Sequence, residues 1–83
     1  MDILLKEDKK YIFNGKSCYF KAEVDQSYFF TSPKAVFEFD DGTEISCIYA
    51  LLAGTYTWTG GTIENGDLAY LGSAWVLRNY VSS

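Results

Sequence analysis

Residues 35–52 read AVFEFDDGTEISCIYALL, and this stretch predicts the β-hairpin on which the fold depends. Apolar and polar residues alternate on both sides of an acidic turn that contains one glycine. Alternation with a period of two places each set of side chains on its own face of a strand. A three-residue loop at 40–42 brings Phe39 opposite Thr43 and Phe37 opposite Ile45, so the large apolar residues share one face.

The alternative loop length gives a register that conflicts with this pattern. A two-residue loop, Asp41-Gly42, would place Phe39 opposite Glu44, which sets a core residue against a charged one. A slip of one residue sends the whole apolar set to solvent, so the pattern specifies the register strongly. The three-residue loop needs a left-handed residue at its end, and Gly42 adopts positive φ without steric cost.

The segment before this hairpin predicts a second one. Asn14-Gly15 follows an apolar run, and Asn-Gly is the strongest short-range hairpin signal. A type I′ turn at this point pairs Phe13 with Lys16 and Tyr11 with Cys18. The returning strand alternates, and its expected inward residues are Cys18, Phe20, Ala22 and Val24.

The remaining turns divide the chain into further short strands. We expect a strand at 28–31, ended by Ser32-Pro33 because proline removes a ladder donor. Asn65-Gly66 predicts a hairpin turn that leads into a returning strand, and Gly72-Ser73 indicates a bulge or corner. Residues 74–81 carry large apolar groups on both faces, which predicts a central strand.

Together these segments predict a single all-β domain over residues 1–83, built from seven to eight short strands. The close spacing of the turns favours a small antiparallel barrel or a curled two-layer sheet. Residues 1–10 hold a short apolar run followed by a charge run, which indicates a frayed arm or an edge strand at 3–5. Aromatic residues, which suit a pleated sheet, make up 18% of the chain and are expected to supply much of the core.

The charge of −4 is unevenly distributed along the chain. Residues 1–34 carry six Lys and five acidic residues, a net charge of +1, whereas residues 35–83 carry Arg78 and six acidic residues, a net charge of −5. Direct binding to nucleic acid is disfavoured, because neutralising phosphates needs clustered Lys and Arg. The acidic region would instead attract a basic protein surface.

The sequence shows no signal peptide and no stretch that approaches a membrane span, so we expect a cytoplasmic protein that does not bind membranes. Cys18 and Cys47 would then be reduced thiols that act as small apolar residues in strands. In a secreted protein, a disulfide between these two cysteines would be the alternative.

Catalytic chemistry has little support. The chain contains no His, which removes His-based triads, Cys–His dyads and His metal sites. No glycine-rich phosphate-binding motif occurs. We therefore expect neither catalytic activity nor a metal or other cofactor.

Acidic residues gather near two predicted turns, at 38–44 and at 64–67. Paired carboxylates can serve as acid and base in glycoside hydrolysis or can hold calcium. The simpler interpretation, which we favour, is that Asp suits turns and solvent. The run at 40–44 also lacks the length and ligand spacing of a calcium loop.

Tyr56 and Trp58 alternate with threonines at 55–59, so both rings share one face of a strand. Aromatic rings on a strand can stack on sugars, bases or a methylated ammonium group. Core packing is the favoured alternative, because a small domain needs its Trp residues inside.

These observations predict a small, acidic, non-enzymatic protein-binding module with aromatic anchors and an acidic rim. A narrower version is an inhibitor or decoy that occupies the basic surface of a nucleic-acid-binding enzyme, by analogy of size and charge with phage-type anti-defence proteins. The alternatives are a structural subunit of a homodimer or larger phage-like assembly, and a binder of small ligands or carbohydrates. The residues expected to contact the partner are Glu38, Asp40, Asp41, Glu44, Glu64, Asp67, Tyr56 and Trp58.

Overall fold

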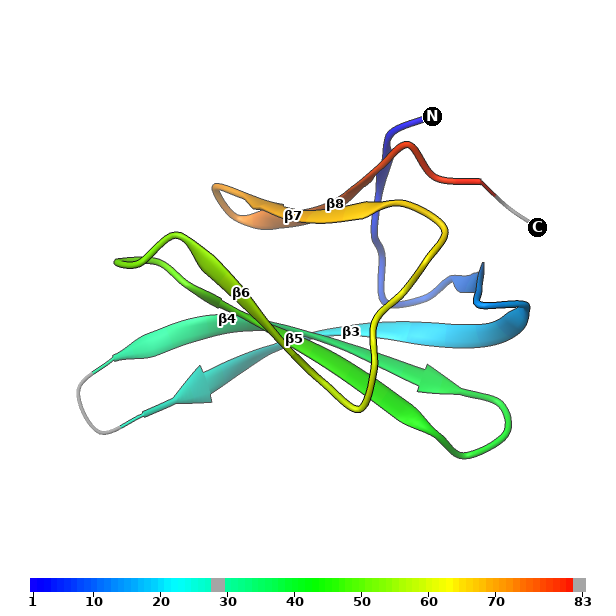
Figure 1. Ribbon diagram of the computed structural model, residues 1–83, viewed down its shortest axis with the longest axis horizontal. Helices are drawn as coiled ribbons and strands as arrows, with labels where there is room; N and C mark the ends of the chain where they lie inside the picture. Colours follow the sequence, from blue (N-terminus) through cyan, green and yellow to red (C-terminus); the bar gives the residue numbers. More distant parts are fainter. Residues whose placement is uncertain (28–29, 82–83) are drawn as a thin grey trace.

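The computed structural model describes residues 1–27 and 30–81 as two packed antiparallel β-sheets (Figure 1). The larger sheet has the strand order β2-β3-β4-β5-β6, and the smaller has the order β1-β8-β7. The described residues form strands and turns but no helix. The strands are β1 (Ile3–Leu4), β2 (Lys10–Phe13), β3 (Lys16–Gln26), β4 (Thr31–Phe39), β5 (Glu44–Ala50), β6 (Thr55–Thr59), β7 (Asp67–Leu71) and β8 (Ala74–Arg78).

The all-β class and the two-layer arrangement are confirmed, whereas the closed barrel does not form. Figure 1 shows the smaller sheet lying across one face of the larger one. The N-terminal segment contributes β1 as an edge strand of the smaller sheet, and β8 is its central strand as the sequence predicts. No helix among the described residues is long and apolar enough to cross a membrane.

The hairpin at 35–52 has the predicted register. Phe37 lies opposite Ile45, and the backbone N–H of Phe39 donates to the carbonyl of Thr43 at 2.9 Å. Gly42 has a φ of 91°, which is the left-handed conformation that the three-residue loop requires. The alternation of apolar residues therefore determines which face of this hairpin enters the core.

The Asn14-Gly15 turn is also confirmed, since Phe13 pairs with Lys16 and both turn residues have positive φ. The strand that follows, β3, continues to Gln26, two residues beyond Val24, the last of its expected inward residues. Its first inward residues, Cys18 and Phe20, are buried as predicted. The last two, Ala22 and Val24, are exposed, so this end of β3 extends beyond the core.

The predicted chain break at Ser32-Pro33 is wrong. Strand β4 begins at Thr31 and runs through Pro33, while residues 28 and 29 of the strand expected there lie outside the described residues. Pro33 pairs with Val24 of β3. On the other side of β4, pairing with β5 begins only at the next residue, Lys34. Proline is tolerated at this position because its missing N–H falls where that ladder stops.

The hairpin turn predicted at Asn65-Gly66 is also wrong. Strand β7 pairs with β8 and not with β6, so residues 60–66 cross from the larger sheet to the smaller one. A Cβ atom at Gly66 would lie 2.7 Å from the carbonyl oxygen of Arg78, so glycine allows a close backbone approach here. Gly72-Ser73 forms the two-residue loop of the β7–β8 hairpin and not a bulge or corner.

The core lies between the two sheets and centres on Phe37, which is fully buried. Its ring lies 5.4 Å from the ring of Phe13 and 5.7 Å from that of Phe20. From the smaller sheet, β8 contributes Trp75 and Leu77 to the same cluster. Burying such aromatic groups supplies most of the driving force available to a domain of this size.

Candidate functional site

Three of the four predicted carboxylates at 38–44 take part in exposed ion pairs with lysines from β2 and β3. We call this region, at the β2–β3 and β4–β5 turns, the ion-pair end. Exposed pairs contribute little to stability, but each lysine offsets the negative charge beside it. The pairs are Lys10–Asp40 at 3.1 Å, Lys16–Asp41 at 2.7 Å and Lys21–Glu38 at 2.8 Å.

Asp41 is the most strongly held of these carboxylates. Its pKa lies well below the usual range, because Lys16 donates a hydrogen bond to it and Thr43 donates two more. Glu44 lies directly opposite Glu38 and forms no ion pair with any described residue. The turn therefore presents much less net negative charge than its sequence suggests.

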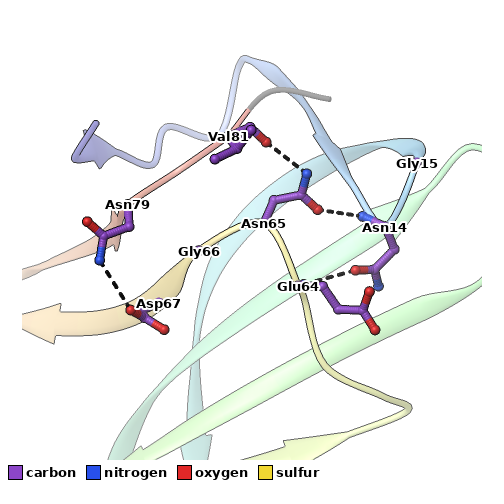
Figure 2. Close-up of a pocket in the computed structure, with 8 residues that line it drawn as sticks. All are labelled: Asn14, Gly15, Glu64, Asn65, Gly66, Asp67, Asn79 and Val81. Carbon is purple, nitrogen blue, oxygen red and sulfur yellow. Dashed lines mark hydrogen bonds between the residues drawn. The ribbon is translucent and has the colours of Figure 1, made fainter.

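Glu64 and Asp67 lie at a polar hollow of about 480 Å³ beside the β2–β3 turn (Figure 2). The asparagine side chains here are bonded to the protein itself. Asn14 accepts from the N–H of Glu64 at 2.9 Å, and the N–H of Asn14 donates to the Asn65 side chain at 2.8 Å. Asn65 in turn donates to the carbonyl of Val81 at 2.8 Å.

These bonds tie the β2–β3 turn, the 60–66 crossover and the C-terminal segment together. We call this network the asparagine brace. The described residues contain no group of three or more Cys, Asp or Glu side chains placed to hold a metal ion. The asparagine side chains at this hollow are bonded to groups of the protein itself.

Tyr56 joins the two sheets. Its ring stacks on Tyr49 with centroids 4.5 Å apart, and its hydroxyl accepts the N–H of Tyr70 at 3.0 Å. Trp58 is half-buried. These two rings and Asp67 line a shared hollow of about 240 Å³, so the structure brings three of the predicted residues together from separate segments.

A surface that the sequence analysis missed lies opposite the ion-pair end. The last residues of β3, β5 and β7 and the first residues of β4, β6 and β8 lie on this side of the molecule (Figure 1). We call this region the apolar end. Its exposed large side chains are Val24 (59% exposed), Phe30 (56%), Leu51 (55%) and Leu52 (82%).

Two hollows lie among these strand ends and the loops beside them. One, of about 390 Å³, has Val24, Pro33 and Trp75 in its wall. The other, of about 580 Å³, has Phe30 and Leu52 in its wall. Thr31 and Leu51 line both hollows, so the two form one continuous surface.

A sequence signal for this surface exists at residues 51–54. Two leucines stand in a hairpin loop, where turn chemistry favours Gly, Pro, Asn, Asp and Ser. Leu52 follows the last residue of β5 by two positions and has no strand partner to pack against. Large apolar residues in a short loop therefore indicate a surface role.

The two thiols are shielded from solvent. Cys18 and Cys47 are buried and free, and burial raises the pKa of Cys18 to about 12 and that of Cys47 to about 11. Strand β4 separates β3 from β5, which places the two strands about 10 Å apart. This exceeds the Cα separation of about 7 Å that a disulfide can bridge, so the disulfide alternative is wrong.

Comparisons with protein-family models, with curated protein sequences and with solved structures found no match for this chain.

Proposed function

We propose that the protein is a small non-enzymatic module that binds another protein through its apolar end. The observation that carries the proposal is that four exposed large apolar side chains, Val24, Phe30, Leu51 and Leu52, line two hollows that share Thr31 and Leu51. Contiguous exposed apolar surface on a folded domain marks an interaction site more often than not. Loops held by a rigid β scaffold are also common places for recognition residues.

The non-enzymatic part of the proposal rests on the available chemistry. The chain has no His, and burial raises the pKa values of its two thiols, so they carry even less thiolate at neutral pH than an exposed cysteine. Two cysteines held too far apart for a disulfide also fit the proposed cytoplasmic location.

The inhibitor or decoy version remains a narrower form of the proposal. Its acidic rim would be reduced to Glu44, Glu64 and Asp67, since lysines offset the other three predicted carboxylates. Unpaired rim charges mainly steer association and contribute less to affinity. We therefore assign the contact to the apolar end and the steering of a basic partner to these residues.

The test is capture of binding proteins from a lysate of the organism that encodes the chain, with two matched variants. The proposal predicts that a protein retained by wild type is lost by Leu51→Ser/Leu52→Ser. It predicts that the same protein is retained by Asp40→Asn/Asp41→Asn, because lysines already offset these two carboxylates. Retention by the leucine variant and loss by the aspartate variant would overturn the assignment to the apolar end.

A second candidate is binding of a small ligand or carbohydrate at the 240 Å³ hollow. The observation that favours it is the meeting of Tyr56, Trp58 and Asp67 in one wall, which combines aromatic faces with a carboxylate. A saturable change in tryptophan emission with a panel of monosaccharides, abolished in Trp58→Phe, would support it. Tryptophan emission that does not change with any sugar of the panel would contradict this second candidate.

A homodimer or larger assembly would use a different surface from the apolar end, namely the outer face of the smaller sheet. Leu77 of the smaller sheet is fully buried, so the alternate row formed by Leu4, Val76 and Ala69 faces away from the core. Leu4 and Leu71 are about half exposed on this outer face. A mass that rises with concentration and returns to that of the monomer in Leu4→Ser would support a homodimer.

A further inference from the structure

The two long hairpins of the larger sheet separate at the apolar end. Pairing between β4 and β5 stops at Lys34 and Ile48, and the next pair in register would be Pro33 with Tyr49. Pro33 has no N–H to donate to that pair, so the ladder cannot continue symmetrically. Figure 1 shows the β3–β4 and β5–β6 hairpins diverging beyond this point.

The hollow of about 580 Å³ lies between the diverging tips. Apolar residues form most of its wall, including Phe30, Leu51 and Leu52. Its volume falls within the range of about 300–1,000 Å³ that is usual for ligand pockets, which is ample for one large apolar side chain. The fork left by Pro33 therefore provides a preformed receptacle at the centre of the apolar end.

Among the described residues that line this hollow, Asp25 is the one that carries a charge. It is half-buried and forms no ion pair with any described residue. Glu23 lies two residues earlier on the same face of β3, but it lies directly opposite Lys34 of β4, so Asp25 is the carboxylate that leaves negative charge at this hollow. A carboxylate at the edge of an apolar receptacle is complementary to a cation that accompanies an apolar group.

We infer that the hollow between the β3–β4 and β5–β6 tips receives a large apolar side chain of a partner protein, with an adjacent Lys or Arg of that partner paired to Asp25. The inference rests on the proposed function and specifies the chemistry of the partner. An anionic lipid surface fits this site poorly, because Asp25 in its wall would repel the headgroups.

Two small probes that share a phenyl ring and differ in charge test this inference. Phenethylammonium and 3-phenylpropionate are titrated separately into isotopically labelled protein, and backbone amide shifts are followed by NMR. The inference predicts saturable shifts centred on residues 50–53 and Phe30, in the millimolar range. It also predicts a preference of about two- to five-fold for the cation, the size expected of one partly exposed charge pair.

Asp25→Asn is expected to abolish the preference for the cation while the shifts at 50–53 persist. Asp8→Asn, at an exposed carboxylate outside the hollow and outside the steering residues, is the matched control and is expected to leave the preference unchanged. Equal response of wild type to both probes, shifts centred elsewhere, or no saturable shift would overturn the inference.

Failure of this inference can be distinguished from failure of the proposed function. If a protein partner is captured through Leu51 and Leu52 and Asp25→Asn retains it with unchanged affinity, the role of Asp25 is overturned and the proposed function stands. If the partner binds the ion-pair end, both are overturned. Retention of only a second copy of the chain, or binding to phosphatidylcholine vesicles through Leu52, would also overturn the inference.

Discussion

The ion-pair end and the apolar end of this molecule are built from the same kind of element, the β-hairpin turn, but they leave different groups at the surface. At the ion-pair end, lysines of neighbouring strands offset the acidic side chains of the turn. At the apolar end, the strands extend beyond the core and leave large apolar side chains uncovered. A cluster of like charges in sequence is therefore a poor guide to a recognition surface, because cross-strand neighbours decide what charge remains.

The two ends also differ in how they are held. The asparagine brace links three segments beside the ion-pair end. At the apolar end, the ladder between β4 and β5 stops before Pro33 and the two hairpins continue separately. Fewer cross-strand bonds lower the free energy of local opening, so we expect the apolar end to be the more adaptable one.

The largest expected effect lies in the core that both ends share. Phe37→Ala removes the fully buried ring that contacts Phe13 and Phe20, which is expected to cost about 3–5 kcal/mol. Leu52→Ala, at the exposed tip, is expected to change the free energy of unfolding by less than about 0.5 kcal/mol. Urea denaturation measures both; a Leu52→Ala cost close to that of Phe37→Ala would show that the tip belongs to the core.

The asparagine brace should give the next largest effect. Asn65→Ala leaves the Asn14 N–H and the Val81 carbonyl without their partner, at an expected cost of about 1–2 kcal/mol. Asn65→Asp keeps the acceptor for Asn14 but loses the donor to Val81, so its cost should be intermediate. Equal stability of wild type and Asn65→Ala in urea would contradict the role of the brace.

Much of this fold could be predicted from the sequence, and the correct parts are local. Alternation and turn chemistry specified the register at Phe37–Ile45 and the turn at Asn14-Gly15, because both depend on neighbours within a hairpin. The error at Asn65-Gly66 arose because the same dipeptide also suits a close crossover between sheets, and only the partner of β7 distinguishes the two.

The candidate site was harder to predict for a related reason. Tyr56, Trp58 and Asp67 share a hollow, which spacing along the chain does not reveal. The apolar end likewise joins Val24 of β3 to Leu51 of the β5–β6 loop, and its exposure depends on where the smaller sheet stops covering the larger one. Sequence patterns indicate which face of a strand is apolar but not how far along the strand the core extends.

The two cysteines allow the local stability of the ends to be compared directly. Cys47 lies opposite Ala35, one pair from the end of the β4–β5 ladder, whereas Cys18 lies opposite Phe39 beside the ion-pair end. In the single-thiol variants Cys18→Ala and Cys47→Ala, we expect the remaining Cys47 to react several-fold faster with a disulfide reagent at pH 8 than the remaining Cys18. Faster reaction of Cys18 would reverse the proposed order of local stability.

The same thiols predict a dependence of stability on pH. Burial raises the pKa of Cys18 from 9.0 to about 12, so the folded state favours the protonated thiol. Stability is then complete below about pH 9 and falls as the pH rises toward 12, because the unfolded chain loses the proton first. Urea midpoints of wild type and Cys18→Ala between pH 7 and pH 11 test this; a midpoint difference that does not change with pH would contradict it.

The smallest effect is expected from an exposed ion pair. Lys16 and Thr43 lower the pKa of Asp41 from its usual 3.8, so the stabilisation is present above that pH and is lost as the pH falls below it. Asp41→Asn should therefore lower the urea midpoint slightly at pH 7 and by less at pH 2. The difference at pH 7 should also shrink in 1 M salt; a large difference that resists salt would indicate that this end is held by more than exposed charges.

The central claim is that the apolar end, and not the acidic turn, contacts the partner. Site-specific photo-crosslinking in the native host tests it most directly, with a benzophenone side chain placed at position 52 in one variant and at position 44 in another. We predict one discrete crosslinked protein from position 52 and none from position 44. A discrete product from position 44 alone would contradict the claim and return the contact to the acidic turn.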